Sequence, residues 1–201
     1  MLDLKRHLFK GLEIKIAKSI SFLPISPNQY TLISIIFALI SFYFLLKQNF
    51  LLVIFFFLIA GFLDFIDGAV ARYKNIATKV GAYLDTICDR YVEGILLLGL
   101  IFLPLPRIFL PGFAWVFLIL FGTFLTTYAK AAAKEKEIVE KELKGGFLSR
   151  GERIILFFLV LILGIVDPSF VWMTELLILI AFAINLTALQ RIYSAIKTAR
   201  I

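Results

Sequence analysis

The chain has 201 residues, of which 61% are hydrophobic and 17% charged, and its net charge is +7. Soluble domains are about 45–50% apolar and about 25% charged, so both a soluble enzyme and a disordered chain are excluded, and we expect an integral membrane protein. The single cysteine, Cys88, and the single histidine, His7, exclude a disulfide within the chain and a Cys- or His-rich metal site. Any metal must be held by carboxylates, which favour Mg²⁺, Ca²⁺ or Mn²⁺.

Residues 2–20 predict an amphipathic helix on the membrane surface. Leu4, Leu8, Leu12 and Ile16 recur every four residues, and the lysines fall mostly elsewhere on the helical wheel. An ordinary soluble helix is the alternative. No cleavable signal peptide is predicted, because basic residues are spread throughout this segment. The predicted division is a surface helix at residues 1–22 and a membrane domain at residues 23–201.

Six apolar segments follow, each near the length of about 20 residues that crosses a bilayer. They are 27–46, 50–73, 81–103, 108–130, 149–166 and 169–196. Capping-box patterns mark two starts, at Ser26 with Gln29 and at Ser149 with Glu152. The predicted fold is therefore all-α: six transmembrane helices preceded by an N-terminal amphipathic juxtamembrane helix.

The basic residues predict the orientation of these spans. If the N-terminus is cytoplasmic and the chain crosses six times, only Lys47 and Arg107 of the 21 basic residues lie outside. The other 19 fall in cytoplasmic segments, as the positive-inside rule requires. Both termini are then expected in the cytoplasm, and the positive net charge reflects basic loops at the membrane rather than a nucleic-acid partner.

Four aspartates interrupt the predicted spans, where a charge at the bilayer centre costs about 2.5–3.5 kcal/mol. Asp64 and Asp67 are three residues apart on one helix, and Asp85 and Asp89 are four apart on the next. Each pair shares a helix face, and consecutive helices joined by a short loop are antiparallel neighbours. We therefore expect the four carboxylates to converge toward the cytoplasmic ends of the helices.

A cation would relieve the repulsion between these carboxylates. Four oxygen ligands could hold two hard divalent ions, and a two-metal site commonly assists displacement at phosphorus. Gly68 and Gly81 allow a ligand to approach closely, and Arg72 can bind a phosphate oxygen. The alternatives are isolated ion pairs with Arg72 and Arg90 for the acids and close helix packing for the glycines.

The segment from Asp64 to Asp89 resembles the signature of the CDP-alcohol phosphotransferases. That signature is D-x2-D-G-x2-A-R-x8-G-x3-D-x3-D, and all eight defining positions match with the family spacing. The resemblance implies transfer of a substituted phosphate from a CDP-linked donor to an alcohol, with release of CMP. It further implies a cytoplasmic active site in a multi-pass membrane protein and a homodimer.

The resemblance also implies roles for individual residues. Asp64, Asp67 and Asp85 would bind two Mg²⁺ or Mn²⁺ ions, and Asp89 would complete the site and act as the general base. The positions expected to bind the CDP-linked donor are Asn28, Thr31, Gly68, Ala71, Arg72, Thr78 and Gly81.

A second cluster, of cations near the cytoplasmic boundary, bears on the acceptor. Its members are Lys130, Arg150, Arg153 and Arg191. They suit an acceptor that already carries a phosphate, and their alternative role is contact with lipid head groups. The surrounding strings resemble the branch of the family that uses inositol 1-phosphate. Glycerol 3-phosphate as acceptor and CDP-inositol as donor are alternatives, beside CDP-diacylglycerol or CDP-archaeol as donor.

A cation transporter is the alternative from another functional class. Transporters commonly place ion sites near the midplane, on broken helices, with repeat symmetry. Here the acids lie toward one side, on unbroken helical patterns, and we find no internal repeat. The sequence therefore favours the transferase.

Overall fold

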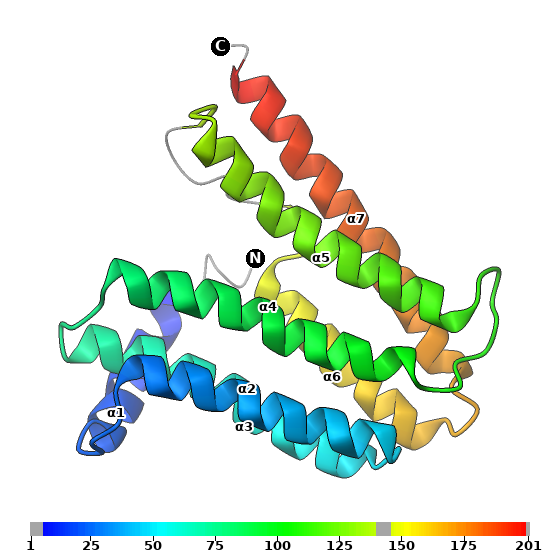
Figure 1. Cartoon of the computed structure of the whole chain (residues 1–201), viewed down its shortest axis with the longest axis horizontal. Helices are drawn as coiled ribbons and strands as arrows, with labels where there is room; N and C mark the ends of the chain where they lie inside the picture. The colour runs from blue at the N-terminus through cyan, green and yellow to red at the C-terminus, as the bar shows by residue number, and fades with distance from the viewer. Residues whose placement is uncertain (1–5, 140–145, 200–201) are drawn as a thin grey trace. The chain divides into compact units, whose positions relative to one another are not determined.

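The computed structural model describes residues 6–139 and 146–199, which form seven helices (Figure 1). The helices are α1 (Arg6–Ile20), α2 (Pro27–Leu46), α3 (Phe50–Tyr73), α4 (Lys79–Ile101), α5 (Gly112–Glu135), α6 (Arg150–Val166) and α7 (Val171–Ala199). The side chains of Leu4, Leu8 and Leu12, which predicted an amphipathic helix, are not among those described, because Leu4 precedes residue 6 and the description of residues 6–10, 12 and 13 covers the backbone alone.

The all-helical prediction is confirmed, and α2 and α3 have the predicted bounds. The bounds of the other four predicted spans differ from the observed helices by up to five residues, and the start of α5 is the clearest case, because the helix expected from residue 108 begins only at Gly112. Pro111 lacks an N–H and disfavours a helical conformation at the residue before it, so residues 108–110 form a tight turn. The helix also continues to Glu135, through alanines and lysines that favour helix.

Four of the described helices are long and apolar enough to cross a bilayer: α2, α3, α5 and α7. Their outward positions carry large exposed apolar side chains, such as Phe62 and Phe117. In water this much exposed apolar surface would be unfavourable, whereas lipid covers it at no cost. The chain is therefore a membrane protein.

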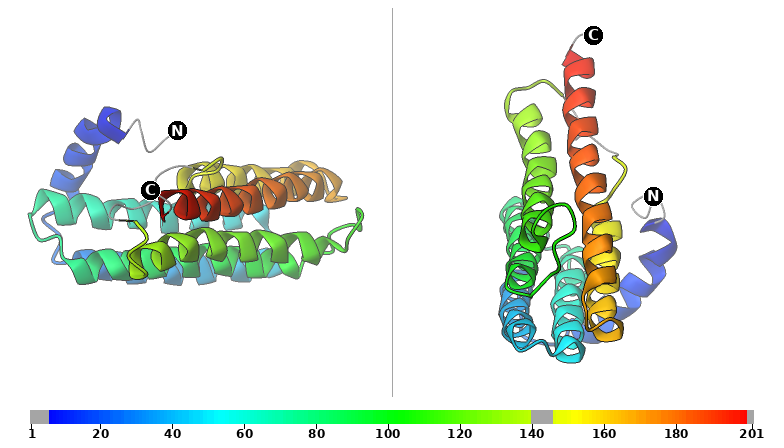
Figure 2. Two further views of the ribbon diagram at one scale, coloured as in Figure 1. Left: turned by 90° about the horizontal axis from the view of Figure 1, so that it is seen from above. Right: turned by 90° about the vertical axis from the view of Figure 1, so that its right-hand side faces the viewer.

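Contacts between helices divide the chain into two compact units, Met1–Gly99 and Leu100–Ile201. In the first unit, α2 and α3 form an antiparallel hairpin (Figures 1 and 2). The Ser41 hydroxyl donates to the Val53 carbonyl at 3.1 Å, and the Phe44 and Phe56 rings stack with centroids 5.4 Å apart.

Helix α4 returns beside α2 and runs parallel to it. A Cβ added at Gly81 would meet Asn28 near the start of both helices, and one at Gly99 would meet Leu45 near their ends. Helix α1 crosses the other side of the hairpin (Figure 2), where Ile16 and Ile20 pack against a buried cluster of Tyr30, Ile66 and Val70. The start of α2, the end of α3 and the start of α4 therefore lie together at one end of this unit.

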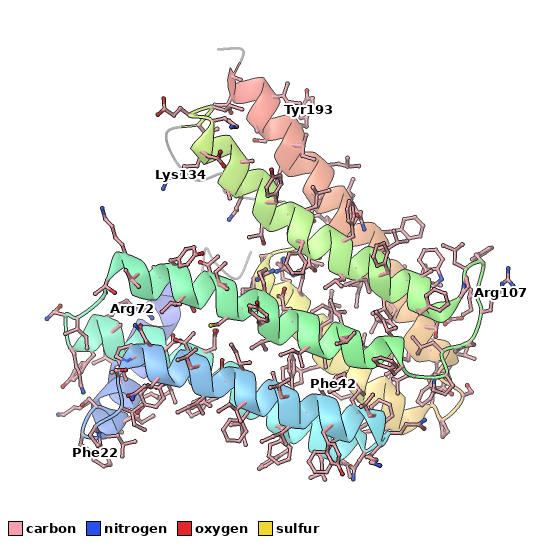
Figure 3. The ribbon with its side chains drawn as sticks, viewed as in Figure 1. Phe22, Phe42, Arg72, Arg107, Lys134 and Tyr193 are labelled. Atoms are coloured by element: carbon pink, nitrogen blue, oxygen red, sulfur yellow. The ribbon has the colours of Figure 1, made fainter. Side chains whose placement is uncertain are left out.

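In the second unit, α5 and α7 are parallel neighbours and α6 runs against α7. The Asn185 amide donates to the Leu118 carbonyl at 3.0 Å, and further along both helices Arg191 Nη1 donates to the Thr126 carbonyl at 2.9 Å. Figure 3 shows Arg107 and Lys134 at opposite ends of α5. The start of α6 is tied to α7 by the Leu148 N–H, which donates to Thr187 Oγ1 at 2.9 Å.

Candidate active site

The site lies in the first unit, where α2 begins, α3 ends and α4 begins. The start of α2 is fixed by the predicted capping box, in which the Ser26 N–H donates to Gln29 Oε1 at 2.7 Å and the Gln29 N–H donates back to Ser26 Oγ at 3.4 Å. Pro27 occupies the first helical turn, where its missing N–H costs nothing. This fixed start sets the direction in which Asn28 and Thr31 project.

Thr78 fixes the start of α4. Its Oγ1 accepts the Gly81 N–H at 3.0 Å, which makes it the N-cap of the helix. A Cβ on Gly81 would lie 3.2 Å from both Thr78 Oγ1 and Asn28 Oδ1, so a residue without a side chain is needed between these two polar groups. The predicted donor-binding role of Thr78 and Gly81 is therefore accompanied by a structural one.

Three of the four predicted metal ligands come together. Asp64 and Asp67 of α3 and Asp85 of α4 each offer a carboxylate oxygen within 4.8 Å of the other two. Asp67 is buried and the others are partly buried. At 4.8 Å and an effective dielectric constant near 20, each pair of carboxylates repels by roughly 3 kcal/mol, so the group calls for a cation.

The donor set fits Mg²⁺ or Mn²⁺. Oxygens on opposite sides of an octahedral Mg²⁺ are about 4.2 Å apart, since each lies about 2.1 Å from the ion. The observed spacing therefore needs only a small side-chain adjustment to hold an ion. Asp89, one turn beyond Asp85, is buried but does not belong to this group of three among the described residues.

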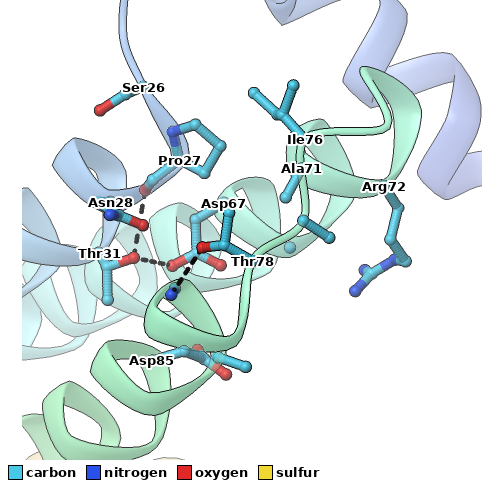
Figure 4. A pocket seen from close by; sticks show the side chains of 14 residues that line it. Ser26, Pro27, Asn28, Thr31, Asp67, Ala71, Arg72, Ile76, Thr78 and Asp85 are labelled. Atoms are coloured by element: carbon cyan, nitrogen blue, oxygen red, sulfur yellow. Dashed lines mark hydrogen bonds between the residues drawn. The ribbon is translucent and has the colours of Figure 1, made fainter.

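A cavity of about 250 Å³ opens beside the carboxylates (Figure 4). It is lined by Ser26, Pro27, Asn28, Thr31, Asp67, Gly68, Ala71, Arg72, Ile76, Ala77, Thr78, Gly81, Ala82 and Asp85. All seven residues predicted to bind the CDP-linked donor are in this set. The motif reasoning missed Ile76 and Ala77 of the α3–α4 loop, which have no signature position and no charge to mark them.

The cavity combines features that attract anions with features that attract cations. The N-termini of α2 and α4 both open onto it, and helix N-termini carry a partial positive charge. Arg72 adds a full charge, and its guanidinium folds back over Gly68, where an added Cβ would lie 3.0 Å from Nη1. A phosphate group and a divalent cation can therefore be held side by side here.

The second unit brings some of the predicted acceptor-binding cations into one region. Arg191 on α7 binds the Thr126 carbonyl of α5, one turn before Lys130. On its other side, the Gly146 backbone lies so close that an added Cβ would be 3.6 Å from Arg191 Nε. Four residues later Arg150 begins α6, and Arg153 is buried in its first turn.

The comparisons with known proteins agree with this chemistry. Residues 24–189 match the model of the CDP-alcohol phosphatidyltransferase family. The chain belongs to this family. It is therefore a membrane-bound transferase that acts on CDP-linked alcohols.

Relatives within the family include inositol phosphate lipid synthases. An archaetidylinositol phosphate synthase of Pyrococcus horikoshii is 31% identical over 191 residues, which cover 91% of this chain and 90% of that protein. A phosphatidylinositol phosphate synthase of Mycobacterium tuberculosis is 31% identical over 136 residues, or 65% of this chain and 60% of that protein.

Solved structures of the Mycobacterium tuberculosis phosphatidylinositol phosphate synthase have the same fold as this chain. The structure in complex with manganese and citrate aligns with a TM-score of 0.78 at 23% identity, over 91% of this chain and 88% of that one. The structure with CDP-DAG bound aligns with a TM-score of 0.77, over 92% of this chain and 94% of that one.

Proposed function

We propose that this protein transfers the lipid-phosphate group of a CDP-linked lipid, CDP-diacylglycerol or CDP-archaeol, to a hydroxyl of inositol 1-phosphate and releases CMP. The observation that carries the proposal is the meeting of Asp64, Asp67 and Asp85 beside a cavity that also holds Arg72 and two helix N-termini. The inositol phosphate acceptor is supported by the similarity of this chain to the inositol phosphate lipid synthases of Pyrococcus horikoshii and Mycobacterium tuberculosis.

In this proposal the cavity binds the diphosphate of the donor. The Arg72 guanidinium donates hydrogen bonds to phosphate oxygens, and the first N–H groups of α2 and α4 offset further negative charge. Asn28, Gly68, Ala71 and Thr78 line the path of the nucleotide. Two divalent ions held by Asp64, Asp67, Asp85 and Asp89 would neutralise the diphosphate and the charge that develops on the departing CMP.

The transfer itself is a displacement at phosphorus. The acceptor hydroxyl oxygen forms a bond to the lipid-linked phosphorus, and the bond from that phosphorus to the CMP oxygen breaks. Asp89 takes the proton of the hydroxyl as general base. The acceptor is held by its own phosphate, through Lys130, Arg150, Arg153 and Arg191.

The substrates are tested by measuring CMP release from the purified full chain with Mg²⁺. CDP-diacylglycerol, CDP-archaeol and CDP-inositol serve as donors, each with labelled inositol 1-phosphate or glycerol 3-phosphate. We expect a labelled lipid product from inositol 1-phosphate. Product from glycerol 3-phosphate alone, or from CDP-inositol alone, would replace the proposed substrates, and metal flux without CMP release would favour a transporter.

Two variants test the residue roles. Asp89→Asn should fold and bind the donor but lose turnover, and a rate near that of the wild type would contradict the general-base role. Arg191→Gln should raise the KM for the phosphorylated acceptor by about tenfold or more, since a charge-assisted hydrogen bond is worth about 1.5–3 kcal/mol. Arg107→Gln is the matched control, because Arg107 precedes the start of α5 at Gly112, whereas Thr126 lies in the second half of that helix.

We further propose six transmembrane helices, with α4 and α6 as the spans beyond the four apolar ones, and a cytoplasmic N-terminus, C-terminus and active site. Residues 1–22 would form the surface helix and residues 23–201 the membrane domain, assembled as a homodimer.

Cysteine labelling tests this topology. Cys88, the chain's one cysteine, is buried, so its labelling background should be low. Cysteines introduced at Lys47 and Lys134 should react with an impermeant maleimide from opposite sides, and light scattering would give the oligomeric state.

A further inference from the structure

We propose that Thr31 is a positioning residue for the metal centre: its hydroxyl fixes the orientation of the Asp67 carboxylate. This goes beyond the donor-contacting role that the motif implies for Thr31, and it rests on the proposed function, in which Asp67 is a metal ligand. Figure 4 shows Thr31 and Asp67 facing each other across the gap between α2 and α3.

The contact itself is a short buried hydrogen bond. Thr31 Oγ1 donates to Asp67 Oδ2 at 2.5 Å, and the two residues are only 3% and 5% exposed. Thr31 Oγ1 also lies 3.2 Å from the Pro27 carbonyl oxygen of its own helix. A hydroxyl has one proton to donate, and the carboxylate takes it because that acceptor is nearer and charged.

This hydrogen bond restricts the Asp67 side chain in a way that serves an ion. It occupies one lone pair of Oδ2 and restricts rotation of the carboxylate plane. The remaining lone pairs then keep one direction relative to Asp64 and Asp85. Partners that orient metal ligands in this manner typically contribute 10–100-fold to metal affinity.

The position of Thr31 is itself well determined. It lies four residues after Pro27, so the capping box at Ser26 and Gln29 sets its height and its direction. Once its proton is donated to Asp67, the hydroxyl has only oxygen lone pairs left to offer a nucleotide. A purely nucleotide-binding threonine would not need to be buried against a carboxylate.

The chain supplies a matched control for this bond. Ser41 is also buried on α2 and also donates across to α3, to the Val53 carbonyl at 3.1 Å. It lies ten residues beyond Thr31, which is about 15 Å along the helix. Ser41→Ala therefore removes an equivalent interhelical hydrogen bond that does not touch an acid.

The test measures Mn²⁺ binding to the purified full chain without nucleotide. The electron paramagnetic resonance signal of free Mn²⁺ reports how much of the ion remains unbound. Asp67→Asn is the positive control for loss of binding. We expect Thr31→Val, which keeps the size of the side chain, to bind Mn²⁺ about 10–100-fold more weakly. Thr31→Ser, which keeps the hydroxyl, and Ser41→Ala should stay within about twofold of the wild type.

Three results would overturn the inference: wild-type affinity in Thr31→Val, an equal loss in Ser41→Ala, or an equal loss in Thr31→Ser. Wild-type Mn²⁺ affinity together with a raised KM for the CDP-linked lipid in Thr31→Val would mark Thr31 as a nucleotide contact instead. Thermal unfolding of each variant separates lost folding from lost affinity. The proposed function fails separately, if the wild-type chain releases no CMP from any donor.

Discussion

Arg90 and Glu93 form a buried ion pair on α4, directly after the last aspartate of the motif. Arg90 Nη1 donates to Glu93 Oε2 at 2.6 Å, and the two side chains are 10% and 3% exposed. The pair is one turn of helix long, so it forms as soon as α4 does. It shows how an acid beyond the site is accommodated in an otherwise apolar stretch of helix.

Breaking this ion pair should destabilise the fold. Removing one partner of a buried pair leaves a buried charge and costs about 3–5 kcal/mol, so Glu93→Leu and Arg90→Met should each lower the unfolding temperature markedly. The double variant Arg90→Met/Glu93→Leu should recover part of the loss, because it removes both charges of the pair together. Thermal unfolding of all four proteins checks this, and additive losses in the double variant would show that the pair is not coupled.

A methyl group at Gly81 should weaken donor binding. The new Cβ would lie 3.2 Å from Asn28 Oδ1 and from Thr78 Oγ1, at the edge of the cavity. Overpacking of this kind costs about 1–3 kcal/mol, so Gly81→Ala should raise the KM for the CDP-linked lipid by about tenfold. Gly61→Ala, where a Cβ meets nothing within 4 Å, is the matched control and should leave KM unchanged. An unchanged KM in Gly81→Ala would argue against donor binding at this edge.

A methyl group at Gly122 should separate α5 from α7. The added Cβ would lie 2.8 Å from Ile184 Cγ2 and 3.0 Å from Asn185 Nδ2, the atom that donates to the Leu118 carbonyl. Gly122→Ala should therefore lower the free energy of unfolding by about 1–3 kcal/mol. Denaturation of purified protein measures the loss, with Gly61→Ala as the variant that should not share it.

The loop between α6 and α7 should make stability depend on pH in acid. The Ser169 hydroxyl and the N–H groups of Trp172 and Ser169 donate to the Asp167 carboxylate, which holds its pKa below the ordinary value of 3.8. Its stabilising contribution is complete above pH 3.8 and is lost as the pH falls through the lower pKa of the folded state. Asp167→Ala should thus melt at a lower temperature than the wild type near pH 7, and the difference should disappear in strong acid. A constant difference across this range would contradict the role of the charge.

The helices could be predicted closely because their signals are local. The bounds of α2 depend on Ser26, Pro27 and Gln29, all within one turn of its start. The late start of α5 was missed because the apolar run continues through residues 108–110, and only the backbone restriction before Pro111 ends it. Local signals therefore place helix ends to within a few residues, and the largest differences are at the two ends of α5, where the apolar run begins before Pro111 and helix-favouring residues continue past residue 130.

The site could be predicted as a set of residues but not as a set of contacts. Motif spacing identified Asp64, Asp67 and Asp85, because three- and four-residue intervals return to the same helix face. It also grouped Asp89 with them, and this part of the grouping stays a prediction; among the residues that the structure describes, Asp64, Asp67 and Asp85 form the group whose carboxylate oxygens lie within 4.8 Å of one another. Which of two same-face residues reaches a neighbouring helix depends on the rotation and tilt of both helices.

By itself, the sequence determined that this is a helical membrane protein, where its helices lie and which family it belongs to, since composition, periodicity and motif spacing are properties of the chain. The tertiary structure decided the pairings: Thr31 with Asp67, 36 residues apart, and Arg191 with the Thr126 carbonyl, 65 residues apart. Threonine and arginine have many potential partners in an apolar chain, and a hydrogen bond requires its two atoms within about 3 Å. Only the packing of whole helices brings particular atoms that close.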